Sequence, residues 1–341
     1  MYHFGKNAYI ELNQWIEDYS PSRILIIDDE NTHKYCYTIL KNELKTEPIS
    51  LTIPPGEENK TLESVQKLLI DMMDAGLDRK SLVLNLGGGI VTDTGGFVAS
   101  IFKRGIPFIH IPTTLLGMVD ASIGGKNGVN LAGAKNQIGV IVPPEKILID
   151  NRYLATLPED EYLSGYAEML KHGLIADMNY YNELIHSTPH SDSIIDLIKK
   201  SVKIKHNIVT KDPKEKGLRK ILNFGHTLGH AIESYSYEKN LPLSHGHSVA
   251  LGMILASYLS HLKFNLEFTF VNNLKNDLLQ TYPVPKWDKQ DIKQILSYLK
   301  HDKKNVSGEV LFVLLEKPGK PVWDQRLTTR QIDEAFHFLL S

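Results

Sequence analysis

The sequence predicts an α/β protein with an N-terminal doubly wound, Rossmann-like domain and a C-terminal, mostly α-helical domain. Three observations support this fold class. Short apolar strands alternate with helical segments up to Asp150. Beyond that residue, helical periodicity dominates and strand patterns are few. The length of 341 residues also exceeds the size at which one hydrophobic core usually stops growing. We therefore expect domains at 1–150 and 151–341.

The N-terminal elements follow from apolar patterns and the residues that end them. Arg23–Ile27 (RILII) is a predicted buried strand between Pro21 and an acidic pair. From Glu58 to Ala75 apolar residues recur at helical spacing, and Gly76 follows as a stop. The other predicted elements here are helices at 31–44 and 92–102 and strands at 49–53, 81–86, 106–111 and 146–149. Between the last two strands, the glycine-rich stretch 112–139 is expected to be a long functional loop.

The second half is predicted to be helical at 159–176, 191–210, 227–235 and 248–262. Residues 309–315 (EVLFVLL) fit either a strand or a buried helical turn, because a short apolar run has no diagnostic period.

Composition excludes several classes of protein. The chain has 38 basic and 40 acidic side chains without long runs of either sign, which argues against nucleic-acid and membrane partners. Its single cysteine, Cys36, rules out an intramolecular disulfide and suits a reducing compartment. The sequence shows neither a signal-peptide pattern nor an apolar run of about 20 residues, so we expect a cytoplasmic location.

The strand at 81–86 runs directly into Gly87-Gly88-Gly89 and then a helix. Such a turn lets backbone N–H groups and the helix N-terminus approach a phosphate. It is not the GxGxxG fingerprint, since Gly95 and Gly96 come too late, and a tight turn without a ligand is an equal alternative. Asp93, expected in the first helical turn, is either a helix-terminus charge or a cofactor contact.

Two imidazoles, His226 and His230, lie four residues apart on one helical face. His245-Gly246-His247 follows ahead of another helix, and Glu168 offers a carboxylate. One Glu and two His ligands leave an open position on zinc, as in catalytic sites. Ordinary structural histidines remain the alternative.

Three lysines stand out by their neighbours. Lys126 follows Gly124-Gly125, Lys135 follows the Gly133-Ala134 pair, and Lys171 lies one helical turn after Glu168. Glycine-flanked lysines suit anionic oxygens, because small neighbours let the ammonium and the backbone converge on one group. Solvated surface lysines are the alternative.

Taken together, these segments resemble the 3-dehydroquinate synthase family over almost the whole chain. The resemblance rests on ordered motifs: PGEENK (55–60), GGGIVTDTGGF (87–97), KRG (103–105), PTTLLGMVDASIGGKNGVN (112–130), AKNQIG (134–139), AEMLKHGLI (167–175), GLRKILNFGHTLGHAIE (217–233) and HDKK (301–304).

The resemblance implies a set of site residues. The metal, zinc or cobalt, would be held by Glu168, His226 and His245. The NAD site would use Asp29, Glu57, Lys60, Gly88, Gly89, Asp93, Thr113, Thr114 and Thr156, together with Lys126 and Lys135. The substrate would meet Asp120, Lys126, Lys135, Asn136, Lys171, Lys205, Arg219, Asn223, His230 and one of Lys303 and Lys304. Arg104 resembles the arginine that reaches a neighbouring subunit's phosphate site, which implies a homodimer.

The reaction implied by the resemblance belongs to the shikimate pathway. A small sugar-acid phosphate, 3-deoxy-D-arabino-heptulosonate 7-phosphate, is oxidised transiently by NAD, loses phosphate, is reduced, opens, and closes by an intramolecular aldol step to 3-dehydroquinate. Other sugar-phosphate cyclases, a polyol dehydrogenase of the glycerol dehydrogenase kind, and a silent nucleotide-binding protein are alternatives. Two local departures are His247, where the family commonly has Glu, and Asn127, where Thr is frequent. His247 is therefore a rival ligand or an outer partner.

Overall fold

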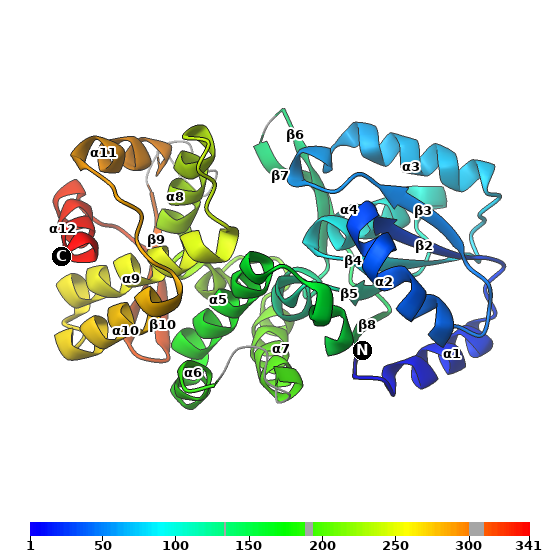
Figure 1. Ribbon diagram of the computed structural model, residues 1–341, viewed down its shortest axis with the longest axis horizontal. Coiled ribbons are helices and arrows are strands. Elements are labelled where there is room, and N and C mark those ends of the chain that lie inside the picture. Colours follow the sequence, from blue (N-terminus) through cyan, green and yellow to red (C-terminus); the bar gives the residue numbers. More distant parts are fainter. Residues whose placement is uncertain (133, 188–193, 300–309) are drawn as a thin grey trace. The chain divides into compact units, whose positions relative to one another are not determined.

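The computed structural model describes residues 1–132, 134–187, 194–299 and 310–341 (Figure 1). The predicted fold class is confirmed, with a parallel sheet in the first half and helices dominating the second. The chain divides into two compact units. Unit 1 comprises Met1–Gly165 and Asp192–Val202, and unit 2 comprises Tyr166–Ser191 and Lys203–Ser341.

Unit 1 is built on a six-stranded parallel sheet in the order β1-β8-β5-β4-β2-β3. Its strands are continuous apolar runs because both sheet faces are covered. In β2 and β4, for example, Leu25, Ile27 and Val83 are fully buried. The strands are β1 (Tyr2–Phe4), β2 (Ile24–Asp29), β3 (Ile49–Ile53), β4 (Leu82–Gly87), β5 (Phe108–Pro112) and β8 (Lys146–Ile149).

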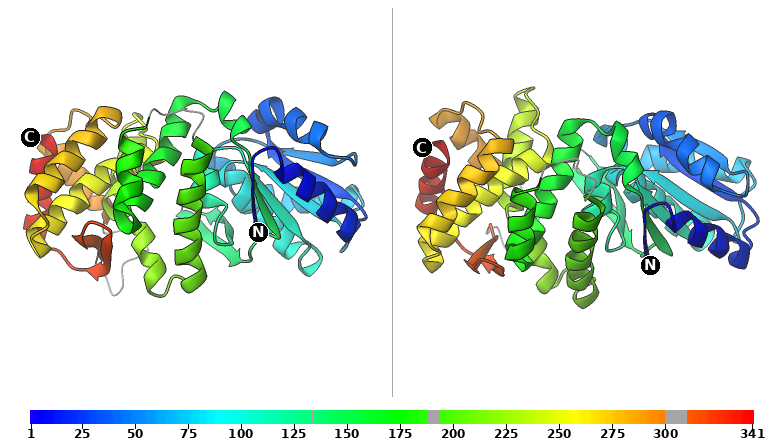
Figure 2. Two further views of the ribbon diagram at one scale, coloured as in Figure 1. Left: turned by 90° about the horizontal axis from the view of Figure 1, so that it is seen from below. Right: turned by 60° about the horizontal axis from the view of Figure 1, so that its bottom comes forward.

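Four helices cover this sheet, which makes it doubly wound (Figure 2). They are α1 (Ala8–Tyr19), α2 (Glu30–Glu43), α3 (Leu62–Asp74) and α4 (Gly89–Ile101). On one face, Leu68 and Met72 of α3 and Val98 of α4 join the buried strand residues in one core cluster. The helix expected from Glu58 begins only at Leu62, because the Thr61 hydroxyl accepts from Ser64 N and caps it.

The stretch 112–139 is not the long loop that its glycines predicted. It contains a π-helical turn at Gly117–Ala121 and an antiparallel hairpin of β6 (Lys126–Leu131) and β7 (Ala134–Ile141). Gly128 and Gly139 face each other across this hairpin, and a Cβ on Gly128 would lie 2.4 Å from the Ile138 carbonyl oxygen. These glycines therefore permit close strand approach rather than flexibility.

Unit 2 is organised around α9, which contacts α8, α10, α12 and β9 and is buried on almost every side. The run at 309–315 contributes to strand β9, paired antiparallel with β10, although residue 309 lies outside the described residues. The elements of the second half are α5 (Glu159–Ala176), α6 (Met178–Ile185), α7 (Ile194–Lys211), α8 (His226–Glu238), α9 (His245–Phe264), α10 (Phe268–Thr281), α11 (Lys289–Tyr298), β9 (Phe312–Lys317), β10 (Lys320–Gln325) and α12 (Thr329–Leu340). No described helix combines the length and apolarity needed to span a membrane.

Candidate metal and nucleotide sites

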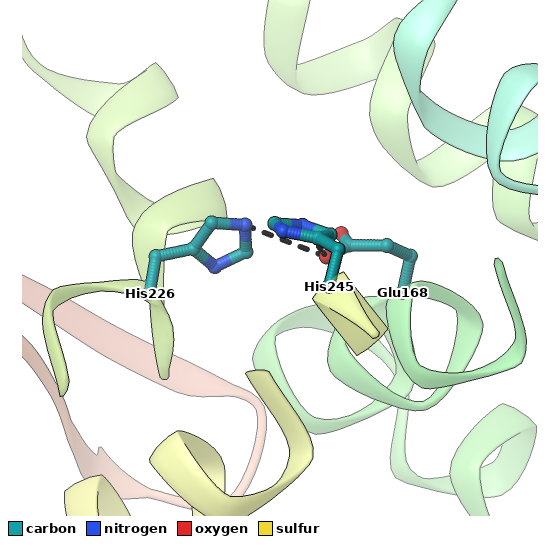
Figure 3. Close-up of side chains that lie close together, drawn as sticks. All are labelled: Glu168, His226 and His245. Atoms are coloured by element: carbon teal, nitrogen blue, oxygen red, sulfur yellow. Dashed lines mark ion pairs between the residues drawn. The ribbon is translucent and has the colours of Figure 1, made fainter. Parts of the chain in front are cut away.

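In unit 2, three helices bring Glu168, His226 and His245 together (Figure 3). The Glu168 Oε1 atom lies 3.4 Å from His226 Nε2 and 3.7 Å from His245 Nε2. Two ligands bound at about 2.0–2.1 Å to a tetrahedral zinc ion are themselves separated by roughly 3.3 Å. The spacing of these three side chains therefore suits one divalent ion.

Both histidines lie at the first position of a helix, earlier than the sequence predicted. Gly225 precedes α8 in the left-handed conformation, with φ of 79°, so that the helix begins at His226. The Ser244 hydroxyl accepts from His247 N at 3.3 Å and thereby starts α9 at His245. These two caps decide where the imidazoles leave the backbone.

The Nδ1 atoms of His226 and His245 each face an oxygen atom outside the ligand group. These contacts fix the orientation of the two Nε2 atoms. His226 Nδ1 donates to the Phe224 carbonyl oxygen at 3.2 Å, and His245 Nδ1 lies 3.5 Å from Glu233 Oε2. With Nδ1 of each ring directed outward, Nε2 is the ring nitrogen that faces Glu168. Glu233 was not among the residues expected in the site; its position one helical turn after His230 was the available signal.

The two oxygens of the Glu168 carboxylate have different surroundings. Its Oε2 pairs with the ammonium of Lys171, whereas the buried Oε1 has no hydrogen-bond partner. Burial raises the pKa of Glu168, but Lys171, followed by His226 and His245, outweighs burial and holds that pKa well below its usual range. An ionised, partly unsatisfied carboxylate facing two imidazoles fits a divalent cation.

The histidine ligands differ in their surroundings. Burial and then the Lys171 ammonium lower the pKa of His226, which favours the neutral ring. For His245, burial is opposed by the neighbouring carboxylates of Glu168 and Glu233, and the pKa rises to about 9. A metal must therefore displace a proton from His245 when it binds.

The described contacts of His247 lead away from the group of Glu168, His226 and His245. Its Nε2 atom lies 2.7 Å from the Pro283 carbonyl oxygen, and its ring packs edge-on against Tyr282 at 5.9 Å. Because His247 is two positions after His245 on a helix, its side chain leaves on a different face. These contacts do not support His247 as a metal ligand, and its role as an outer partner of the metal stays a prediction.

The segment before α8 carries two of the residues expected to bind the substrate, Arg219 and Asn223. Asn223 Nδ2 donates to Glu215 Oε1 at 2.8 Å, and the buried Arg219 donates from Nη1 to the Pro213 carbonyl oxygen at 2.8 Å. Asp212 accepts from the backbone N–H groups of Gly217 and Arg219, which fixes this segment. The sequence analysis did not predict Glu215 as the partner of Asn223. The only feature of the sequence that could have indicated it is an acidic residue between two lysines just before the motif at 217–233.

His230 and Lys205 complete the residues expected in unit 2. The His230 ring lies 5.3 Å from that of His226 and 5.8 Å from that of His245, measured between centroids. Lys205 is buried in α7. Lys303 and Lys304 lie outside the described residues.

In unit 1, four of the predicted cofactor residues lie at the carboxyl edge of the parallel sheet: Gly88, Gly89, Thr113 and Thr114. Gly88 caps α4, and a Cβ placed on it would lie 2.9 Å from Thr114 Cγ2. Thr113 N donates to the Gly87 carbonyl oxygen at 3.1 Å, which joins the ends of β4 and β5. This edge is where open α/β sheets bind nucleotides, and the N-terminus of α4 at Gly89 lies on it.

A second group in unit 1 centres on the buried Lys60. Its Nζ atom donates to Asp93 Oδ2 at 2.6 Å and to Asn136 Oδ1 at 2.7 Å. Asp93 is the fifth residue of α4 rather than part of its first turn, because the helix begins at Gly89; it serves as the partner of Lys60. Asn130, which was not predicted, donates to Glu57 Oε1 at 2.9 Å and binds this group to η1 (Glu57–Asn59).

The remaining predicted residues of unit 1 have separate settings. Asp29 caps α2 by accepting from Thr32 N at 2.8 Å. Thr156 is exposed and is the last residue of the 3-10 helix η4 (Asn151–Thr156). Asp120 lies in the π-helical turn. Lys126 and Lys135 are exposed on the hairpin, and Lys135 lines a surface pocket with Glu57 and Asn130. Arg104 is exposed in a strained turn, with φ of 75°.

Unit 2 contains a group of three metal-ligand side chains, and unit 1 contains a parallel sheet of the kind that binds nucleotides at its carboxyl edge. These two features are typical of a metal- and nucleotide-dependent enzyme of the α/β class. Residues 50–164 match the family described as 3-dehydroquinate synthase N-terminal, and residues 165–305 match 3-dehydroquinate synthase C-terminal. A 3-dehydroquinate synthase from Parabacteroides distasonis is 39% identical over 338 residues, covering 98% of this chain and 96% of the relative. The chain belongs to the 3-dehydroquinate synthase family.

Two solved structures are also similar. A 2-deoxy-scyllo-inosose synthase, complexed with carbaglucose-6-phosphate, NAD+ and Co2+, superposes with a TM-score of 0.86 at 26% identity, covering 98% of this chain and 95% of its own. The 2-epi-5-epi-valiolone synthase of Streptomyces hygroscopicus, with NAD+ and Zn2+ bound, gives a TM-score of 0.82 at 26% identity and covers 100% and 96% of the two chains.

Proposed function

We propose that this chain converts 3-deoxy-D-arabino-heptulosonate 7-phosphate into 3-dehydroquinate and inorganic phosphate, and that it regenerates its NAD in each turnover. Family membership across both halves of the chain supports the reaction class. The observation that carries the proposal is the Glu168 carboxylate, with one oxygen paired to Lys171 and the other facing two imidazole nitrogens.

Glu168, His226 and His245 hold the divalent metal in this proposal, as zinc or cobalt. When bound, the metal supplies Lewis-acid stabilisation of an alkoxide, and NAD supplies reversible acceptance of a hydride. His230, whose ring adjoins those of both histidine ligands, relays a proton at the substrate hydroxyl. Lys171 neutralises Glu168 and presents further N–H donors to the substrate.

Anion recognition falls to the basic and amide residues expected from the sequence. Lys205, Arg219 and Asn223 bind the carboxylate or phosphate of the substrate, as do Lys126 and one of Lys303 and Lys304. Asp120 and Asn136 accept hydrogen bonds from its hydroxyl groups. Fixing both ends of a flexible sugar acid supplies the orientation that successive elimination and ring closure require.

The cofactor is assigned to the N-terminal part of the chain. Gly88 and Gly89 receive the pyrophosphate of NAD, with Thr113 and Thr114 beside them. The remaining residues assigned to this cofactor are Asp29, Glu57, Lys60, Asp93, Lys126, Lys135 and Thr156. We retain 1–150 as the NAD-binding domain and 151–341 as the metal- and substrate-binding domain.

Two further properties belong to the proposal. A homodimer is inferred from the resemblance of Arg104 to the arginine that reaches a neighbouring subunit's phosphate site; Arg104 is exposed in the turn Lys103–Gly105. A cytoplasmic location remains a prediction from the single cysteine.

The choice among ring-forming enzymes rests on similarity. The relative from Parabacteroides distasonis is 39% identical to this chain, whereas the inosose and valiolone synthases are each 26% identical. The lysines and Arg219 expected for a carboxylated substrate are present. Both facts favour the heptulosonate phosphate over an uncarboxylated sugar phosphate.

The decisive experiment incubates the full chain with heptulosonate phosphate, NAD and zinc, and measures phosphate release, absorbance at the NADH band, and the ring product by mass spectrometry. We expect phosphate and 3-dehydroquinate in equal amounts without net NADH. NADH formed in proportion to substrate would indicate a polyol dehydrogenase instead. Absence of phosphate release would overturn the proposal.

A further inference from the structure

Beneath the glycine turn that precedes Lys126, unit 1 contains three buried polar side chains from three strands. Asn85 in β4 is 0% exposed, His110 in β5 is 1% exposed, and Asn127 in β6 is 4% exposed. Buried polar groups of this kind persist when they are hydrogen-bonded to one another. None of the three has been assigned a role in the proposed reaction.

The donors and acceptors of these side chains follow one order, from Asn85 through His110 to Asn127. Asn85 Nδ2 lies 3.2 Å from His110 Nδ1, and because an amide nitrogen only donates, His110 Nδ1 is the acceptor. The ring proton is then on Nε2, which donates to the Asn127 side chain. Burial lowers the pKa of His110 to about 3, so the ring is neutral, as this pattern requires.

Asn127 carries the chain of hydrogen bonds to the backbone of the turn. Its Nδ2 atom donates to the Val142 carbonyl oxygen at 2.8 Å and to the Gly125 carbonyl oxygen at 3.1 Å. Val142 N donates to the same Gly125 oxygen at 2.8 Å. The left-handed Gly125, with φ of 67°, is thus held from two sides.

The glycine pair Gly95-Gly96 of α4 packs against this network. A Cβ on Gly95 would lie 2.0 Å from Asn85 Oδ1, and one on Gly96 would lie 2.2 Å from Asn127 Oδ1. Larger residues would therefore displace the amides. Helix α4 begins at Gly89 and packs on β6, so the same helix adjoins both the nucleotide edge and the lysine turn (Figure 1).

Alternation along β6 connects the network to Lys126. Asn127 points into the core and Lys126, its neighbour, is exposed. Because successive side chains of a strand leave on opposite faces, anchoring the Asn127 amide sets the direction in which the Lys126 ammonium is presented.

We propose that Asn127, supported by His110 and Asn85, is the positioning residue for Lys126, and that it acts by fixing the Gly124-Gly125 turn against α4. The inference rests on the proposed function, in which Lys126 binds an anionic group of the substrate. A side-chain hydroxyl has one proton and cannot donate to both carbonyl oxygens at once, whereas the Asn127 amide donates to both. The amide of Asn127 therefore holds the carbonyl oxygens of Gly125 and Val142 at the same time.

The test compares Asn127→Leu with a matched control in the metal- and NAD-loaded full chain. The control is Asn13→Leu in α1, since Asn13 is also buried and its Nδ2 donates to two carbonyl oxygens, those of Tyr9 and Glu43, at 2.9 and 2.7 Å. We expect Asn127→Leu to raise the KM for heptulosonate phosphate about tenfold with a smaller change in kcat. Asn13→Leu lowers thermal stability and leaves KM unchanged.

A double-mutant cycle with Lys126→Met shows whether the effect passes through the lysine. If Asn127 acts by positioning Lys126, Asn127→Leu adds nothing to the KM of the Lys126→Met enzyme. An equal rise in KM in both backgrounds, or an unchanged KM in Asn127→Leu, would overturn the inference. Failure of the unaltered enzyme to release phosphate would instead refute the proposed function.

Two substitutions of His110 give an independent measurement should Asn127→Leu fold poorly. His110→Gln retains an N–H donor for Asn127, and we expect its KM to stay within about twofold of the unaltered enzyme. His110→Leu has no donor and should raise KM as Asn127→Leu does. Equal KM values for the Gln and Leu variants would contradict the positioning role.

Discussion

The metal-ligand group of unit 2 and the lysine turn of unit 1 are held in place by different means. Glu168 is fully buried, and the nearby histidine rings have their own outer acceptors at Phe224 and Glu233. Lys126, in contrast, is exposed, and its direction depends on a buried amide beneath the backbone. The metal-ligand group is expected to lose its metal when one ligand is removed. The lysine turn is expected to bind the substrate more weakly, without losing binding altogether, when one of its supports is removed.

The largest effect is expected from the metal ligands. Glu168→Gln or His245→Ala should remove stoichiometric zinc and lower phosphate release at least about a thousandfold, because the stabilisation of an alkoxide by the metal is worth several kcal/mol. Metal content is measured by mass spectrometry of the purified protein, and folding by circular dichroism.

The matched control for His245 is His247→Ala on the same helix. His247 is bonded to the Pro283 carbonyl oxygen and should be dispensable for zinc. Loss of zinc from His247→Ala would show that the ligand set assigned to unit 2 is incomplete.

An intermediate effect is expected at the lysine turn. Lys126→Met should lower kcat/KM for heptulosonate phosphate by roughly 10- to 100-fold, since a charge-assisted hydrogen bond is lost, while zinc content stays at that of the unaltered enzyme. Lys67→Met, an exposed lysine of α3, is the control and should leave kcat/KM unchanged. If Lys126→Met also lost zinc, the contrast between the two groups would disappear.

The buried His110 makes the sheet unit sensitive to acid. Its pKa is about 3 in the folded protein and about 6.5 when unfolded. Between these values the unfolded chain binds more protons, so stability present at neutral pH is lost as the pH falls. From pH 7 to pH 5 the contribution amounts to about 2 kcal/mol of unfolding free energy.

Urea denaturation at both pH values, compared with that of His110→Gln, measures this term. The variant should lose less stability on acidification by about that amount. Parallel pH dependence in the two proteins would assign the acid sensitivity to other groups.

The smallest effect is expected outside the ligand set. Glu233→Gln removes the carboxylate beside His245 Nδ1 and should weaken zinc binding about tenfold, with the ligands intact. Competition with a chelator of known affinity measures the change, and Glu238→Gln at the exposed end of α8 is the control. An unchanged zinc affinity would show that Glu233 does not support the ligand.

The local sequence was sufficient for elements with a strong period or clear ends. The helix at 159–176 and the strand at 146–149 were predicted with the bounds observed. The region at 112–139 was predicted wrongly because glycines that let two strands approach look, in one dimension, like those of a flexible loop.

The sequence by itself determined the donor types of the candidate sites, because chemistry such as one carboxylate with two imidazoles is a property of side chains and their order. Only the tertiary structure decided which donors meet. The caps at Gly225 and Ser244 place His226 and His245 at the first positions of their helices. The hydrogen bond to the Pro283 carbonyl oxygen directs the His247 ring away from these two histidines. Likewise, the path from Asn85 through His110 to the turn before Lys126 joins three strands that are distant along the chain, and no local pattern records such a contact.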